Sequence, residues 1–179
     1  QLTYGSYLRV EDLLSLQHPH KRPEHPDELL FIITHQAFEL WFKQILHELG
    51  SVLTLMERDP LEDRDLSTIV HRIDRVVTIQ RLLVDQINVL ETMTPLDFLD
   101  FRDLLFPSSG FQSLQFRLIE IRAVARGLHL VLMDKAQARG IDAIAQTTML
   151  LWPVGKYVAQ MAVTMGRAHF RAHHPQRCV

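Results

Sequence analysis

The sequence has 179 residues, of which 47% are hydrophobic, and its formal net charge is -2. This length and hydrophobic content predict one globular domain with a sizeable core and exclude a disordered chain. The net charge argues against a nucleic-acid-binding protein, which needs a basic surface.

Cysteine usage and hydropathy indicate the compartment. The single cysteine, Cys178, cannot form an internal disulfide, so we expect a protein of the reducing cytoplasm. The sequence has no apolar run of about 18 residues, so we expect no membrane span. The chain begins at Gln1 with neither a Met nor a signal-peptide pattern, which suggests part of a longer protein.

The first half of the chain predicts helices. Residues 1–10 are expected to be extended or irregular, and residues 11–17 to form a short helix. Residues 18–27, HPHKRPEHPD, form a loop whose prolines stop helices on both sides. A long helix from about Glu28 to Glu57 follows, because apolar side chains recur along it at helical spacing. Its stripe is Phe31, His35, Phe38, Phe42, Ile45 and Leu49.

A charged run, ERDPLEDRD at 57–65, is typical of a solvated loop. A second long helix is predicted from Ser67, as its N-cap, to about Glu91. Thr94 and Pro95 then begin a short third helix, with proline at its first position.

The loop FPSSG at 106–110 contains serines that can cap a fourth helix, from Phe111 to about Arg139. A fifth helical segment runs from Ile141 toward His174. No period-2 alternation is present, so the fold class is all-α, with antiparallel helices in one bundle that forms a single domain over residues 1–179.

Two aromatic-polar pairs are candidates for a ligand site. Phe31 and His35 are four residues apart, as are Phe98 and Arg102, so each pair shares a helix face. A lone histidine in an apolar run is more often a core residue with a hydrogen-bond partner. An arginine on an apolar face needs either a neighbouring aspartate or a ligand carboxylate, which it binds in bidentate fashion.

Two further signals are weaker. Ser108, Ser109 and Gly110 precede a helix, where small residues make either an anion-binding nest or an ordinary cap. Near the C-terminus, His174 and Cys178 read H-x-x-x-C, a weak metal signal because structural zinc needs four ligands.

Four stretches together resemble the tryptophan 2,3-dioxygenase family, in its order and spacing. They are LTYGSYL (2–8), DELLFIITHQAFELWFKQILHEL (27–49), VLETMTPLDFLDFRDLL (89–105) and SSGFQSLQFRLIE (108–120). The resemblance implies a helical oxygenase that contains heme b and acts on L-tryptophan or a close indole amino acid. With O2 it yields N-formylkynurenine, the first step of tryptophan catabolism by the kynurenine pathway.

The resemblance also implies roles for individual residues. His35 corresponds to the distal histidine, from which we expect a hydrogen-bond donor beside bound oxygen, near the indole nitrogen. Phe31 and Phe98 correspond to the aromatic walls of the substrate pocket, and Arg102 to the arginine that binds the substrate carboxylate.

Other residues of the pattern belong to the cofactor and to a neighbouring subunit. Ser108, Ser109 and Gly110 correspond to a loop beside the heme, where Trp41 is also expected. The N-terminal residues Tyr4, Tyr7 and Leu8 correspond to a segment that reaches into the active site of another subunit. The resemblance therefore implies a homotetramer.

The pattern departs from the family after residue 120. The family's proximal heme ligand is a histidine shortly after a tryptophan, but here Trp152 is followed by PVGKY. Either the ligand has moved, or segments are missing after about residue 122, or the protein is a divergent relative. We expect His169 as the axial ligand, with His174, His173 and His129 as alternatives.

The divergent relative would be a heme-dependent monooxygenase or hydroxylase of the same superfamily that acts on a tryptophan or tyrosine derivative. Some such enzymes bind heme covalently through H-x-x-x-C, which would involve Cys178. A protein that binds heme or indole without catalysis is a third hypothesis.

Overall fold

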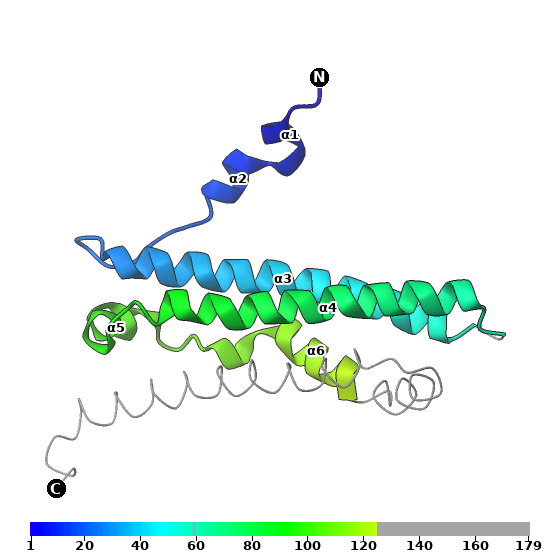
Figure 1. The fold of residues 1–179 in the computed structure, drawn as a ribbon. Coiled ribbons are helices and arrows are strands. Elements are labelled where there is room, and N and C mark those ends of the chain that lie inside the picture. The colour runs from blue at the N-terminus through cyan, green and yellow to red at the C-terminus, as the bar shows by residue number, and fades with distance from the viewer. Residues whose placement is uncertain (59, 125–179) are drawn as a thin grey trace, which may run out of the picture.

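The computed structural model describes residues 1–58 and 60–124, and every regular element in these ranges is helical (Figure 1). The elements are α1 (Tyr4–Leu8), α2 (Val10–Leu14), α3 (Pro26–Met56), α4 (Asp63–Leu90), α5 (Pro95–Arg102) and α6 (Leu114–Val124), with short 3-10 turns η1 (Asp103–Leu105) and η2 (Gly110–Gln112). The predicted all-α class is confirmed. The predicted fifth segment lies outside the described residues.

Helix α3 forms almost where the periodicity predicts it. It begins at Pro26, with His25 as the N-cap, whose Nδ1 accepts a hydrogen bond from the Asp27 amide at 3.3 Å. Proline suits the first helical position because its φ is already helical and its missing N–H has no partner to lose there. The two acidic residues of the first turn complement the positive end of the helix dipole.

The core lies between α3 and α4, which run side by side as an antiparallel hairpin (Figure 1). Its apolar side chains are buried on the facing stripes, and Phe116 and Ile119 of α6 join them; those contributed by the hairpin are Phe38, Phe42, Ile45, Leu49, Val52, Ile69, Ile73, Val76, Val77, Ile79, Leu83 and Ile87. Each fully buried large side chain stabilises the fold by roughly 1.5–3 kcal/mol. The hairpin is therefore the stable platform of the described chain.

One buried carboxylate also joins the two long helices. Glu48 of α3 is 1% exposed and accepts hydrogen bonds from Arg72 and Arg75 of α4, at 2.9 and 2.7 Å. Gln44 donates a further bond to the same carboxylate at 2.7 Å. Because the charge is buried with three donors, it fixes how the two helices align.

Helix α6 runs parallel to α3 and is fastened to it at two levels. Gln115 donates to the backbone oxygen of Glu39 at 2.9 Å, and Arg122 donates to that of Leu46 at 3.1 Å. The same separation of 76 residues at both contacts fixes the parallel register. Between these contacts the ring of Phe116 packs on Phe42, with centroids 5.6 Å apart.

The N-terminal prediction was wrong. Residues 1–10 contain α1, which begins with a capping box between Thr3 and Ser6. Residue Arg9 then adopts a left-handed conformation, with φ 52°, and α2 follows over Val10–Leu14, where we expected a helix at 11–17. Local side-chain bonds and not apolar periodicity define these short helices, so the periodicity could not reveal them.

Two predicted caps were also wrong. Helix α4 begins at Asp63, inside the charged run, and Ser67 is an exposed residue within the helix. Asp65 is buried and pairs with Arg58 at 2.9 Å, which explains why charged residues begin this helix. Before α6, Ser113 accepts a hydrogen bond from the Phe116 amide at 3.1 Å, the role expected of Ser108 or Ser109.

In the described ranges, no helix is both long and apolar enough to cross a membrane.

We predict that Glu48→Leu lowers the free energy of unfolding by about 3 kcal/mol, because Arg72 and Arg75 lose the buried anion that pairs with them. Urea denaturation measures this change. The matched control is Glu62→Leu, which removes an exposed glutamate from an exposed pair with Arg64 and should change stability little.

The same residue should make stability depend on pH. Burial raises the pKa of Glu48, but the hydrogen bonds from Arg75, Gln44 and Arg72 outweigh it and hold the pKa below its ordinary value of 4.5. A lowered folded-state pKa stabilises the fold above the unfolded value, and this contribution is lost as pH falls through the folded value. A Glu48→Gln variant that keeps the full acid-induced loss of stability would contradict this assignment.

Candidate functional site

Three phenylalanines gather where α5 packs against the start of α3. The ring of Phe31 lies 5.7 Å from that of Phe98 and 5.9 Å from that of Phe101, and the last two rings are 5.4 Å apart. Phe101 is completely buried. Phe31 and Phe98, far apart in sequence, therefore belong to one aromatic cluster. Their predicted role as walls of a substrate pocket stays a prediction.

The loop before α3 holds α5 in this position. Glu28 of α3 is completely buried and accepts hydrogen bonds from the amides of His20 and Lys21, at 2.7 and 2.9 Å. The Lys21 ammonium in turn donates to the backbone oxygen of Asp100 at 2.7 Å. Helix α5 is itself fixed at its start by a capping box between Thr94 and Asp97.

His35 lies one turn after Phe31, half-buried, with its ring 4.0 Å from the phenyl ring. Its Nδ1 lies 2.7 Å from the backbone oxygen of Phe31. A carbonyl oxygen can only accept, so Nδ1 carries the proton and donates. Desolvation by burial lowers the pKa of His35, although the bond to Phe31 and the charge of Glu39 oppose this effect.

The tautomer changes the chemistry expected of His35. A neutral imidazole with its proton on Nδ1 presents a lone pair at Nε2, which accepts a hydrogen bond or a proton. The sequence led us to expect a donor at this position. Within residues 1–58 and 60–124, only the Phe31 oxygen bonds this imidazole, so Nε2 has no hydrogen-bond partner there.

Arg102 ends α5, where its charge complements the helix dipole. None of the neighbouring aspartates pairs with it. The Asp97 carboxylate accepts from Thr94, and that of Asp100 lies 3.7 Å from His25 Nε2. No hydrogen bond or ion pair to Arg102 forms among the described residues.

The Ser108–Ser113 loop follows α5 and η1. Three hydrogen bonds within this segment are local: the Ser108 hydroxyl donates to Leu105, the Ser109 amide to Gln112 Oε1 at 3.0 Å, and the Ser113 amide to Gly110 at 3.2 Å. The loop leads from α5, which touches α3 at Phe31, to α6, which is bonded to Glu39. These levels of α3 are about 12 Å apart along its axis, and His35 lies midway between them.

The remaining predicted residues are distributed more widely. Trp41 is half-buried and packs against the core. Tyr4, Tyr7 and Leu8 are exposed on α1, which projects away from the hairpin (Figure 1), and they do not reach the aromatic cluster of their own chain. The candidate ligands His129, His169, His173 and His174, and Cys178, lie outside the described residues.

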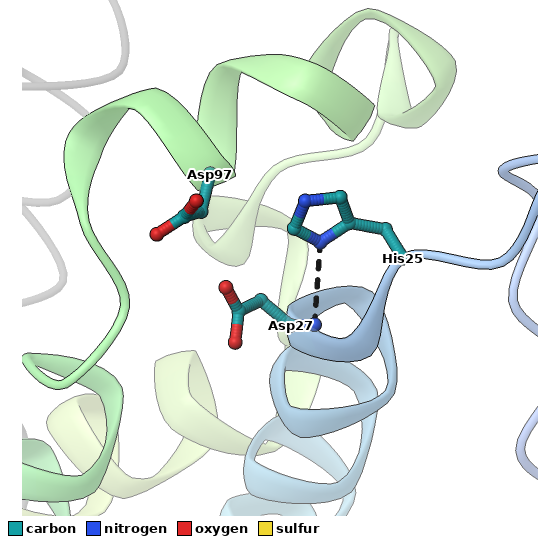
Figure 2. A group of neighbouring side chains, drawn as sticks. All are labelled: His25, Asp27 and Asp97. Atoms are coloured by element: carbon teal, nitrogen blue, oxygen red, sulfur yellow. Dashed lines mark hydrogen bonds between the residues drawn. The ribbon is translucent and has the colours of Figure 1, made fainter.

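Figure 2 shows a group in which His25, Asp27 and Asp97 bring potential metal-ligand atoms within 4.8 Å of one another. The His25 Nδ1 lone pair already accepts the Asp27 amide, and the Asp97 carboxylate already accepts from Thr94. Both aspartates also lie in the first turns of helices, whose positive ends attract anions and repel cations. We therefore interpret the group as two helix caps that meet.

Sequence reasoning missed two features of the site. Phe101 is three residues after Phe98 on the same helix face, so its place in the cluster could have been found from spacing alone. The contact between Glu39 and Gln115 joins residues 76 apart, and no local pattern signals it.

Comparisons with known proteins identify the family of this chain. The family model described as tryptophan 2,3-dioxygenase matches residues 1–150. The chain is similar to three proteins named tryptophan 2,3-dioxygenase. That of Anopheles gambiae is 52% identical over 134 residues, which are 73% of this chain and 34% of the relative. That of Bdellovibrio bacteriovorus is 53% identical over 66% of this chain and 34% of the relative.

The third relative, from Dictyostelium discoideum, is 53% identical over 65% of this chain and 30% of its own length. The chain thus spans about a third of the length of the curated relatives it matches.

We predict that His35 is neutral at pH 7, with its proton on Nδ1. Long-range ¹H–¹⁵N NMR correlations of ¹⁵N-histidine-labelled protein distinguish the two tautomers. Glu39→Gln removes a charge that raises the pKa of His35, and should therefore lower that pKa further. The control is Glu57→Gln at the far end of α3, which should leave it unchanged. A His35 pKa above its ordinary 6.5 would contradict the assignment.

Proposed function

Because the chain belongs to the tryptophan 2,3-dioxygenase family, we propose that it acts as a heme-dependent dioxygenase that opens the indole ring of L-tryptophan. One observation carries the proposal. His35 is a neutral histidine whose Nε2 has no hydrogen-bond partner among the described residues, and its ring lies beside Phe31. Phe31 packs on Phe98 of α5, and Arg102 at the end of that helix has no partner among the described residues. In this arrangement Arg102 is the group proposed for the substrate carboxylate, and His35 with its aromatic neighbours is proposed for the indole ring.

The amino-acid end of the substrate is bound by Arg102 in the proposed complex. A guanidinium binds a carboxylate through two parallel hydrogen bonds, which fix its orientation as well as its position. No aspartate of the same helix competes with the ligand, since Asp97 and Asp100 interact with Thr94 and His25 instead. This geometry supports the ligand interpretation of Arg102 over the structural one.

The indole ring lies against Phe31 and Phe98 in this proposal, and its N–H donates to His35 Nε2. Aromatic side chains provide a flat apolar wall for a flat ligand. The Phe31 oxygen holds the imidazole through Nδ1, so the acceptor is oriented before the substrate binds. His35 can then accept the indole proton or hold it by a hydrogen bond during oxygen insertion.

The described residues fit one face of a heme site. A neutral imidazole and a phenyl side chain lie side by side there, which suits an apolar cofactor surface. Activation of O2 is the chemistry that heme b supplies when it is bound. Ser108, Ser109, Gly110 and Trp41 would lie beside the cofactor, and His169 remains our first choice of axial ligand.

The proposed assembly is a homotetramer in which the N-terminal segment is exchanged between subunits. The exposed fractions of Tyr4 and Tyr7 are 78% and 71%. Large aromatic side chains exposed on a projecting segment need a partner surface, and a second copy of the chain supplies one. The base of the segment is anchored, because Gln36 donates to the Leu16 oxygen at 3.1 Å.

The decisive experiment is an absorption spectrum of the full-length protein, ferric and ferrous, before and after L-tryptophan is added under air. We expect a Soret band that shifts with tryptophan, followed by the formylkynurenine chromophore. Labelled O2 should place two heavy oxygen atoms in the product. One oxygen atom would assign the monooxygenase chemistry instead, and absence of both heme and turnover would refute the proposal.

We further predict that Arg102→Ala weakens binding of L-tryptophan by about 10- to 100-fold, because a charge-assisted pair to the carboxylate is lost. Binding of an indole that lacks the carboxylate should change little. Titration of the Soret shift measures both affinities. Arg64→Ala, which alters an exposed arginine on α4, serves as control. Equal loss of affinity for both ligands would mean that Arg102 does not bind the carboxylate.

A further inference from the structure

Two side chains of α6, Gln115 and Arg122, donate hydrogen bonds to α3, and they lie at different distances from the site. Gln115 uses both amide hydrogens of Nε2, one for the Glu39 backbone oxygen at 2.9 Å and one for Glu39 Oε2 at 2.8 Å. Glu39 lies one helical turn after His35. Arg122 makes the other contact at Leu46, about 16 Å beyond His35 along the helix axis.

Gln115 also lies directly after the Ser108–Ser113 loop. Hydrogen bonds within the loop hold the amides of Ser109, Gln112 and Ser113. The position of the loop along α3 depends on the two helices that it joins. The packing of Phe98 and Phe101 holds the α5 end, whereas Gln115 contacts α3 just after the other end.

Apolar packing alone does not fix that second end. Phe116 packs on Phe42, but a contact between two rings tolerates a shift along the helix axis. A hydrogen bond to a backbone oxygen does not tolerate such a shift, because the oxygen has one place in the helix. The second bond, to the Glu39 carboxylate, is charge-assisted and therefore stronger than a neutral one.

We propose that Gln115, through Glu39, is a positioning residue that sets the height of the Ser108–Ser113 loop along α3. The structural part of this inference stands on the contacts alone. Its catalytic consequence rests on the proposed function: a loop at the wrong height would misplace the wall of the pocket beside His35, and small misplacements at a site slow the reaction.

The experiment compares Gln115→Met with Arg122→Met in the full-length holoenzyme. Each variant replaces the donor with a flexible apolar side chain, and each removes a contact between the same two helices. Hydrogen–deuterium exchange reports on the amides of Ser109, Gln112 and Ser113, which the loop bonds protect. Thermal unfolding of both variants shows whether they lose comparable overall stability.

We expect exchange at these loop amides to rise about tenfold in Gln115→Met, which corresponds to the loss of about one net hydrogen bond. In Arg122→Met it should stay at the wild-type rate. We also expect kcat/KM for L-tryptophan to fall severalfold in Gln115→Met alone. Glu39→Gln keeps the backbone acceptor and a side-chain oxygen, so it should retain slow exchange in the loop.

Equal exchange at these amides in both methionine variants would overturn the inference, whether the rates rise together or stay unchanged. Faster loop exchange with unchanged kcat/KM would overturn its catalytic part. If the wild-type holoenzyme does not turn over tryptophan, the proposed function fails, but the exchange comparison still decides whether Gln115 holds the loop.

Discussion

Burial of one apolar face of α3 is the constraint on which the described structure depends. The first turns of α3 pack against α5, and its middle packs against both α4 and α6. Since these helices all pack on α3, their positions relative to one another are set by where each contacts it. The side chains proposed to bind substrate are therefore positioned by a helix whose stability comes from elsewhere along its length.

The same helix creates the chemical environment of His35. The buried imidazole loses solvation, which favours its neutral form, and the Phe31 oxygen selects the tautomer. Neither effect needs another charged residue to act on the ring. The charge of Glu39 raises the pKa of His35 and so opposes the effect of burial. Glu39 also accepts the Gln115 bond, so one carboxylate links the ionisation of His35 to the position of α6.

The sequence predicted the long helices well because the apolar spacing that indicates a helix recurs over many turns. Periodic apolar residues located α3 to within about two residues, and the Thr94–Pro95 signal located the start of α5. Ser67 failed as a cap because the helix could extend back to Asp63 once Arg58 paired with Asp65. That pairing is a tertiary event, which a cap pattern cannot anticipate.

The candidate site residues were predicted from evidence other than long apolar periodicity. Phe31, His35, Phe98 and Arg102 came from the family resemblance and from spacing within helices, and the structure places Phe31, His35 and Phe98 in one cluster. The proton on His35 could not be assigned from sequence, since it depends on a carbonyl one turn away. The Gln115 contact could not be found either, because it depends on the packing of α6.

Most buried polar side chains of the two long helices have hydrogen-bond partners, but some do not. The buried carboxylates Glu28, Glu48 and Asp65 all have donors, as stability requires. Gln80 of α4 is buried without a hydrogen-bond partner in the described ranges, so a missing partner alone does not mark a site.

Arg102 differs from Gln80 because it carries a charge that has no partner among the described residues, while aspartates on its own helix bond to other residues. The Arg102 guanidinium therefore lacks an anion among the described residues, and a ligand carboxylate would supply one.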